Sequence, residues 1–327
     1  MAAILISVSP NLEYLAITQP LHSRIAIHVG GSPGSLHYDY PLDRLLHRAN
    51  ADPGNISYLR NLRRVYFIVD ETCIFQYDQY YIHIEFLDRT RLVDNLPSIE
   101  SVGTDALCEN DYDGTRLEPG SSKISRTHLN HCALKAPYLA YFTFSCKKLR
   151  EFQYTVGRRK MLGGQFVPFN PKISRKSIFP HKDALEFLYI DAERHMYYFN
   201  HWKIDEDVEW KIDGRDPDFE NDYYYPERQS FIKSMWEIKG SMRDFRALRR
   251  LSIGIGLLLY FATGVGENCE AKEEFMLPDG LPENLEYLCI RGYEPGHSQT
   301  KDKHMDALLA YSESGSSKLK EIVGIDE

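Results

Sequence analysis

The sequence predicts an α/β fold in which strand–helix repeats of irregular length stack into a curved solenoid. Three observations support this prediction: one apolar pattern recurs along the chain, helix-like segments lie between its copies, and 43% of the 327 residues are hydrophobic. A single strand–helix unit cannot bury its own apolar faces, so neighbouring units must share one continuous core. We therefore expect a single domain over residues 1–327.

The recurring pattern is an apolar residue, two variable residues, a second apolar residue, one variable residue and a third apolar residue. Because alternate side chains of a strand share one face, each copy predicts a short strand with one buried face. The phrases PNLEYLAI and PENLEYLCI, near opposite ends of the chain, favour a true repeat over chance spacing in an ordinary α/β protein. The copies are Leu12, Leu15 and Ile17; Leu62, Val65 and Phe67; Ile99, Val102 and Thr104; Ile124, Thr127 and Leu129; Leu149, Phe152 and Tyr154; Leu185, Leu188 and Ile190; Leu248, Leu251 and Ile253; Leu285, Leu288 and Ile290; and Leu319, Ile322 and Gly324.

Segments with a helical spacing of apolar residues lie between these copies, and Asp302 is a candidate N-cap for the last of them. The chain therefore alternates between strand and helix. The predicted helices cover residues 43–49, 80–92, 138–149, 230–239 and 305–311.

Three successive copies begin 25 residues apart, at Ile99, Ile124 and Leu149. This spacing lies inside the period of about 20 to 29 residues that leucine-rich repeats have. The middle copy continues as LNHCAL, which places Cys132 where such repeats turn at an Asn or Cys. We expect Cys132 to be a structural turn residue and not to form a metal site with His128 and His131.

Several stretches resemble the C-terminal leucine-rich-repeat region of fungal F-box proteins: CKKLREFQYTVG, KDALEFLYI, LPENLEYLCIRGYEPG and KLKEIVGIDE. The resemblance covers nearly the whole chain. It implies that the repeats recruit a substrate, while an N-terminal F-box docks on the adaptor of a cullin-type ubiquitin ligase. Here the first copy follows Met1 almost at once, at Leu12, which leaves no room for an F-box. We expect the ligase adaptor as a partner only if an F-box is encoded upstream.

The variable positions of each strand copy are the candidate binding residues. They alternate with the buried positions, so they face outward on the concave side that the solenoid predicts. Tyrosine and arginine recur among them, and both are enriched at the hot spots of protein interfaces. The predicted protein-binding residues are Tyr14, Arg64, Tyr66, Arg126, His128, Asn130, Glu151, Gln153, Phe187, Tyr189, Asp191, Arg250, Tyr287 and Arg291.

Composition and motifs argue against several other classes of protein. A net charge of -8 gives no overall basic field for nucleic acid. The most apolar stretch, residues 251–266, is shorter than the roughly 20 residues that span a membrane, so we expect a buried element there.

Six scattered cysteines without a Cys-x-x-Cys pair indicate a reducing compartment, cytoplasm or nucleus. We found no phosphate loop, dinucleotide fingerprint, nucleophile elbow or metal motif, so we expect no cofactor and no enzymatic activity.

Two segments stand apart from the repeats. An acidic, tyrosine-rich insertion covers about residues 203–229; it could attract a basic partner segment or a basic patch of its own chain, but a solvated insertion between repeats is favoured. The first residues, Ala2 to Ile6, are apolar where the end of a solenoid normally carries a polar cap. We expect this end to be exposed and adhesive unless a partner or further sequence covers it.

The sequence thus favours a non-catalytic, protein-binding repeat domain, resembling the substrate-recognition part of an F-box-type ligase receptor. One alternative is a stand-alone scaffold with the same binding face and no link to ubiquitin. Another is a small-molecule α/β enzyme, which would need a deep closed pocket holding a strongly perturbed ionisable group.

Overall fold

The structure is a computed structural model that describes residues 2–18, 41–68, 81–83, 86–108, 117–134, 136–157, 169–192, 238–263, 275–315 and 317–325. These residues belong to two compact units. Unit 1 spans Met1–Leu149 and Gln153–Val167, and unit 2 spans Arg150–Phe152 and Pro168–Glu327. Strand β7 (Glu151–Thr155) contributes residues to both. Each unit is described by itself.

Every copy of the apolar pattern forms a strand. The strand order is β1-β2-β4-β6-β7 in unit 1 and β7-β8-β9-β10-β11 in unit 2, so spatial neighbours are also successive copies of the pattern. Where the register is defined, neighbouring strands are parallel. The strands are β1 (Tyr14–Thr18), β2 (Arg64–Ile68), β4 (Ser101–Asp105), β6 (Arg126–Asn130), β8 (Phe187–Asp191), β9 (Arg250–Gly254), β10 (Tyr287–Arg291) and β11 (Glu321–Val323).

The strand register aligns the apolar positions of successive copies. In unit 1, Leu15 pairs with Val65, which pairs with Val102, and the last two side chains are buried. In unit 2, Leu251 pairs with both Leu188 and Leu288, and all three are buried. This alignment makes continuous apolar rows, which explains why the spacing recurs in the sequence.

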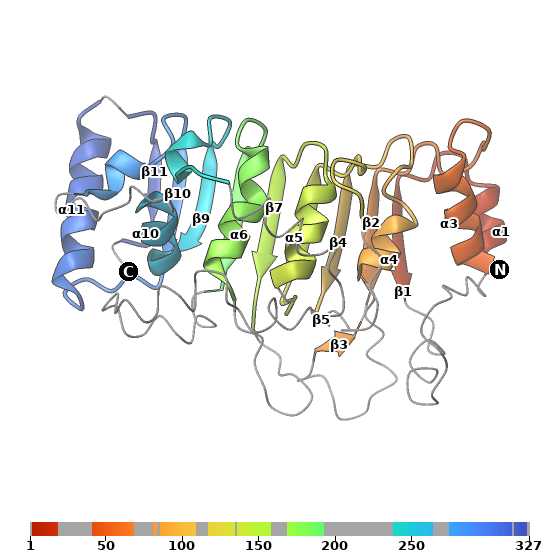
Figure 1. Cartoon of the computed structure of the whole chain (residues 1–327), viewed down its shortest axis with the longest axis horizontal. Helices are drawn as coiled ribbons and strands as arrows, with labels where there is room; N and C mark the ends of the chain where they lie inside the picture. Colours follow the sequence, from red (N-terminus) through yellow and green to blue (C-terminus); the bar gives the residue numbers. More distant parts are fainter. Residues whose placement is uncertain are drawn as a thin grey trace. The chain divides into compact units, whose positions relative to one another are not determined.

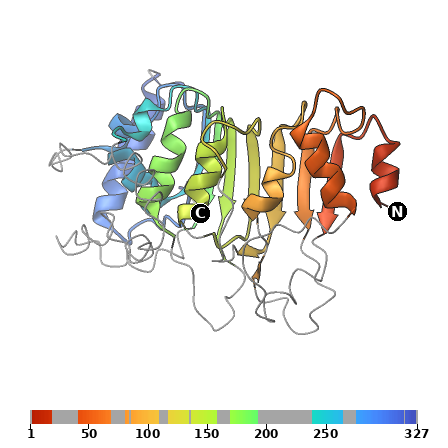
Figure 2. The ribbon, with the colours of Figure 1, turned by 45° about the vertical axis from the view of Figure 1, so that its right-hand side comes forward.

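The helices of unit 1 cover one face of its strands. In both views α3, α4 and α5 lie on the same side of β1, β2 and β4 (Figure 1 and Figure 2). Phe86 of α4 packs against Phe67 of β2 and Phe142 of α5, with ring centroids 6.2 and 5.2 Å apart. The other face of these strands is thus left for the outward side chains. The helices of this unit are α1 (Ala2–Ser7), α3 (Pro41–Ala51), α4 (Phe86–Arg91) and α5 (Ala136–Ser145).

Unit 2 also places helices on one face of its strands, with α6 and α10 visible there in Figure 1. Residues 251–263 are buried almost throughout, first as β9 and then as α10, as expected for a buried element. No helix in the described ranges is both long and apolar enough to cross a membrane. The helices are α6 (Pro171–Ile178), α10 (Ile255–Thr263) and α11 (Gln299–Glu313), with short 3-10 turns η2 (Phe179–His181), η5 (Met242–Asp244) and η6 (Leu277–Gly280).

Three predicted helices are confirmed, since α3, α5 and α11 contain or largely overlap residues 43–49, 138–149 and 305–311. The helix predicted at 80–92 is too long. It begins only at Phe86, because Ile82–His83 (β3) pair instead with Leu107–Cys108 (β5) in a small parallel sheet. Most of the helix predicted at 230–239 lies outside the described residues.

The N-cap predicted for α11 is also wrong. Ser298 caps this helix, and its side chain accepts a hydrogen bond from the Lys301 amide. Asp302 lies within the first turn, where Oδ1 accepts hydrogen bonds from the Tyr293 hydroxyl at 2.9 Å and from the Gly296 amide at 3.2 Å. Its carboxylate therefore fixes the loop that precedes the helix.

The fold is thus a mixed α/β arrangement built on a parallel sheet that is not closed: among the described strands, β1 and β11 each have a neighbour on one side only. The leucine-rich-repeat solenoid and the single domain over residues 1–327 stay predictions. The acidic insertion at about 203–229 lies outside the described residues.

Candidate protein-binding surface

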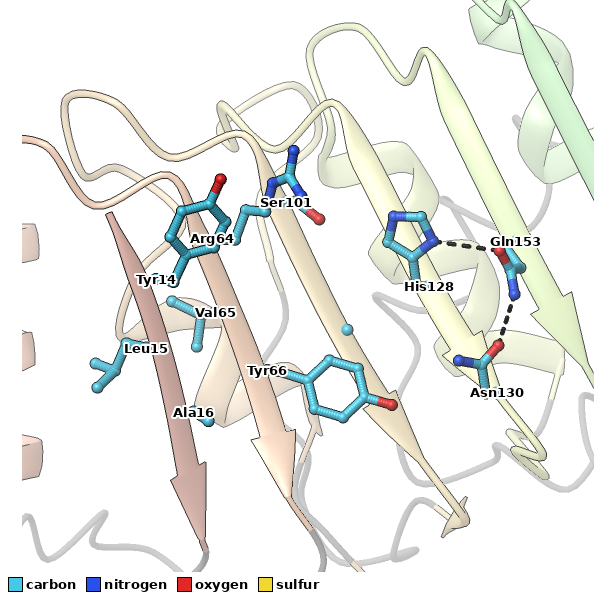
Figure 3. Close-up of a pocket in the computed structure, with 11 residues that line it drawn as sticks. Tyr14, Leu15, Ala16, Arg64, Val65, Tyr66, Ser101, His128, Asn130 and Gln153 are labelled. Atoms are coloured by element: carbon cyan, nitrogen blue, oxygen red, sulfur yellow. Dashed lines mark hydrogen bonds between the residues drawn. The ribbon is translucent and has the colours of Figure 1, made fainter. Parts of the chain in front are cut away.

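A shallow hollow of about 570 Å³ lies on the sheet of unit 1 (Figure 3). Five neighbouring strands contribute to it, and six of the predicted binding residues line it. Tyr14 and Tyr66 are 58% and 37% exposed, whereas Phe67, the neighbour of Tyr66 on the same strand, is buried. This alternation confirms that Tyr14 and Tyr66 face outward. The lining residues are Tyr14, Leu15, Ala16, Arg64, Val65, Tyr66, Ser101, Gly103, His128, Asn130 and Gln153.

The ring of Tyr66 lies across the neighbouring strand β4 (Figure 3). It can do so because β4 carries Gly103 at this point: a Cβ atom there would lie 2.8 Å from Tyr66 Cδ2. Partial burial raises the pKa of the Tyr66 phenol, although a hydrogen bond with the Asn130 side chain opposes the shift. The phenol therefore stays protonated at neutral pH and can donate a hydrogen bond.

Three more polar side chains lie beyond Tyr66 on the next strands of the sheet. Gln153 Nε2 donates to Asn130 Oδ1 at 2.7 Å, and His128 Nδ1 lies 3.3 Å from Gln153 Oε1 (Figure 3). Because an amide oxygen only accepts, His128 must donate from Nδ1, which leaves Nε2 as an acceptor in the neutral ring. Asn130, Gln153 and His128 are thus joined by two side-chain contacts, and Tyr66 lies beside them in the lining of the hollow. We call these four residues the polar row.

Arg64 supplies the positive charge of the hollow. Its guanidinium carbon lies 5.2 Å from the centre of the Tyr14 ring, a cation–π contact between paired positions of β1 and β2. Arg64 is exposed. In the part of the chain that the structure describes, no carboxylate is within ion-pair distance of it.

His128, His131 and Cys132 turn to different partners. His128 contacts Gln153, whereas His131 Nδ1 lies 2.8 Å from Asp105 Oδ1. Cys132 is fully buried, burial raises the pKa of its thiol, and Sγ donates to the Asn130 carbonyl at 3.2 Å. Cys132 is thus a buried residue whose amide also donates to the Thr155 carbonyl at 2.8 Å, and its role as the turn residue of a repeat stays a prediction.

In unit 2 the predicted residues form a separate group of aromatic and arginine side chains. The Arg250 guanidinium carbon lies 5.1 Å from the Phe187 ring centre and 5.8 Å from that of Tyr287. Arg291 lies over Tyr189 at 4.3 Å, and its Nη1 contacts Asp191 Oδ2 at 2.6 Å.

Arg126 and Glu151 are half-buried at the first positions of β6 and β7, and neither lines the hollow.

The sequence argument did not single out Gly103 as a binding position, since a glycine offers no side chain to bind with. A signal was nevertheless present, because Gly103 occupies an outward position next to a strand that carries a tyrosine.

Comparison of the chain with protein-family models, curated proteins and solved structures gave no significant match.

Proposed function

We propose that unit 1 binds a segment of another protein on the sheet face that holds the hollow, without catalysing a reaction. The polar row is the observation that carries this proposal. Its four side chains are part-exposed, and contacts join His128, Gln153 and Asn130, while the apolar side chains of the same strands already form the core. Ordering polar side chains on a surface costs conformational entropy, which preorganisation for a ligand explains.

The chemistry of the hollow fits a protein ligand better than a reacting small molecule. Tyrosine and arginine are the residue types that dominate protein-binding hot spots. The hollow is open and spread over five strands, whereas small-molecule sites usually enclose most of the ligand. His128, the obvious candidate for a general base, is engaged with an amide and not with a nucleophile.

A finer proposal concerns the biological setting. We infer that the chain is a leucine-rich-repeat domain of the kind that recognises substrates for an F-box-type ubiquitin ligase, in the cytoplasm or nucleus. The agreement between pattern copies and parallel strands supports the repeat assignment. A stand-alone scaffold is the alternative. Translating the transcript upstream of Met1 separates them: an F-box that recovers the ligase adaptor supports the receptor, and an upstream stop codon contradicts it.

A peptide selection tests the binding function. Peptides displayed on phage are selected on the wild-type chain, and the affinity of the best binder is measured by fluorescence polarisation for Tyr66→Ala and Tyr58→Ala. Tyr58 is a half-buried tyrosine in a loop of the same unit and does not line the hollow. We expect a loss of about 10-fold or more for Tyr66→Ala only. Failure to select a binder, or equal effects of the two variants, would contradict the proposal.

A further inference from the structure

We infer that the bound segment presents an aspartate or glutamate side chain to Arg64, and that the carboxylate and the guanidinium form an ion pair in the hollow. This inference rests on the proposed function of the same site. It adds the chemical class of the group that the site recognises.

Arg291 in unit 2 shows what a fully partnered arginine on this kind of strand looks like. Its guanidinium lies over the Tyr189 ring at 4.3 Å, and Nη1 contacts Asp191 Oδ2 at 2.6 Å. An aromatic ring orients the planar guanidinium, and a carboxylate receives its N–H groups. Stacking and a charge-assisted hydrogen bond are the two interactions for which arginine is suited better than lysine.

Arg64 has the first of these partners, and no residue of the described ranges supplies the second. The Tyr14 ring lies 5.2 Å from the guanidinium carbon, and the two residues occupy paired positions of adjacent strands. Within the described ranges no acidic side chain pairs with Arg64, although the preceding residue, Arg63, pairs with Glu100 at 3.5 Å. Asp105, on the neighbouring strand β4, contacts His131 instead of Arg64. A ligand can therefore supply the missing carboxylate.

The same incomplete arrangement occurs independently in unit 2. Arg250 is the first residue of β9, as Arg64 is the first residue of β2, and it lies against the rings of Phe187 and Tyr287 at its paired positions. It too has no carboxylate partner among the residues that the structure describes. An arginine that lies against aromatic rings at the start of a strand therefore occurs in both units.

A carboxylate fits the hollow better than a phosphate. Among the described lining residues Arg64 alone has a permanent charge, and this matches the single negative charge of a carboxylate. Phosphorylated segments are usually recognised by clusters of arginines, which match their charge of nearly -2. The surrounding groups fit an acidic side chain on an extended segment: the Tyr66 hydroxyl can donate to it or to its backbone, and His128 can accept from a backbone amide.

A double-mutant cycle tests the ion pair. The probe is the peptide selected on the wild-type chain, in which each aspartate is replaced in turn by asparagine and each glutamate by glutamine. Affinities are measured against the wild type, Arg64→Gln, Arg64→Lys and the control Arg63→Gln. We expect one acidic position whose replacement weakens binding about 10-fold to the wild type and to Arg63→Gln, and hardly at all to Arg64→Gln. Arg64→Lys should recover only part of the affinity, since lysine lacks the planar fork.

The outcomes separate this inference from the function on which it rests. If peptide binding depends on Tyr66 but no acidic position couples to Arg64, the ion pair is wrong and the binding function stands. If binding depends on neither Tyr66 nor Arg64, both are wrong. If a phosphoserine at the coupled position binds far more tightly than glutamate, and glutamate no better than glutamine, the site recognises phosphate and the inference is overturned.

Discussion

Gly103 determines where the ring of Tyr66 lies, and Tyr66 begins the polar row. An added Cβ atom would lie 2.8 Å from Tyr66 Cδ2 and 3.1 Å from the His128 carbonyl oxygen. The first distance requires the ring to move, and the second requires a small shift of the backbone. The absence of a side chain at this position thus leaves room for the Tyr66 ring.

We expect Gly103→Ala to weaken binding of the selected peptide about as much as Tyr66→Ala does, about 10-fold, because the ring must swing off β4. The cost in unfolding free energy should stay within about 1 to 3 kcal/mol, typical of overpacking. Fluorescence polarisation and chemical denaturation measure the two effects. Gly54→Ala is the matched control, since an added Cβ there has no neighbour within 4 Å. Unchanged peptide affinity in Gly103→Ala would show that the position of the ring does not matter.

One side chain of α3 fastens the segment that follows α4. Asn50 Nδ2 donates to the Arg91 carbonyl and to Asp94 Oδ1, each at 2.8 Å, and Asn50 Oδ1 accepts from the Asn95 amide at 2.8 Å. Residues 96–100 connect this segment to β4, so the contact anchors the chain before that strand. Burial raises the pKa of Asp94, and the hydrogen bond from Asn50 opposes the shift.

We expect Asn50→Ala to lower the unfolding free energy by about 1 to 3 kcal/mol at neutral pH, because it leaves partly buried polar groups without partners. A raised pKa means that Asp94 favours folding below its ordinary value near 3.8 and costs stability as the pH rises through the folded-state pKa. Removing Asn50 raises that pKa further, so the deficit should be larger at pH 7 than near pH 4. Urea unfolding at both pH values measures this deficit in unfolding free energy. Asn55→Ala is the control, because the side-chain amide of Asn55 contacts only the exposed Asp52. A deficit that shrinks as the pH rises would contradict this interpretation.

The strands could be predicted from the sequence because their apolar positions are aligned by the register and so recur with one spacing. Helices α1, α6 and α10 could not. The sequence of α6, PKISRKSI, is mostly polar although all of its residues are buried, and its two isoleucines are five positions apart, so no apolar pair has the spacing of one helical turn. The sequence of α10, IGLLLYFAT, is apolar on nearly every side, so no helical period stands out and only its burial could be predicted.

The candidate site was predictable to a similar degree. Alternation along each strand identified Tyr14, Tyr66 and the other outward residues, because the pleat of a strand fixes which way each side chain faces. The contacts between them depend on the strand order and on which residues are paired, so the hydrogen bonds of the polar row could not be foreseen. Neither could the difference between Arg64 and Arg291, since Asp191 and Arg291 are 100 residues apart in the chain.

Unit 1 as a whole also exposes an apolar surface on α1, as the sequence predicted. Ile4, Leu5 and Val8 are 69%, 58% and 68% exposed, whereas Ile6 is buried. Such a contiguous group on a short helix is unusual for a surface that stays in water.

Replacing Ile4, Leu5 and Val8 together by serine should lower the fluorescence of bound 1-anilinonaphthalene-8-sulfonate and reduce self-association at high protein concentration, because these exposed side chains no longer offer apolar contact. Dye titration and sedimentation velocity measure these effects. The same triple variant should leave peptide affinity unchanged, since none of the three residues lines the hollow. Unaltered dye binding would show that the apolar surface of α1 is not accessible.

Tyrosine footprinting of the peptide complex tests most directly the claim that the outward face of the unit 1 sheet is the binding surface. The free chain and the complex are nitrated with tetranitromethane, and modification of Tyr14, Tyr66 and Tyr58 is quantified by mass spectrometry. The account predicts that the peptide protects Tyr14 and Tyr66, which line the hollow, and leaves Tyr58 as reactive as before. Protection of Tyr58, or equal reactivity of Tyr66 with and without peptide, would place the binding surface elsewhere and contradict the account.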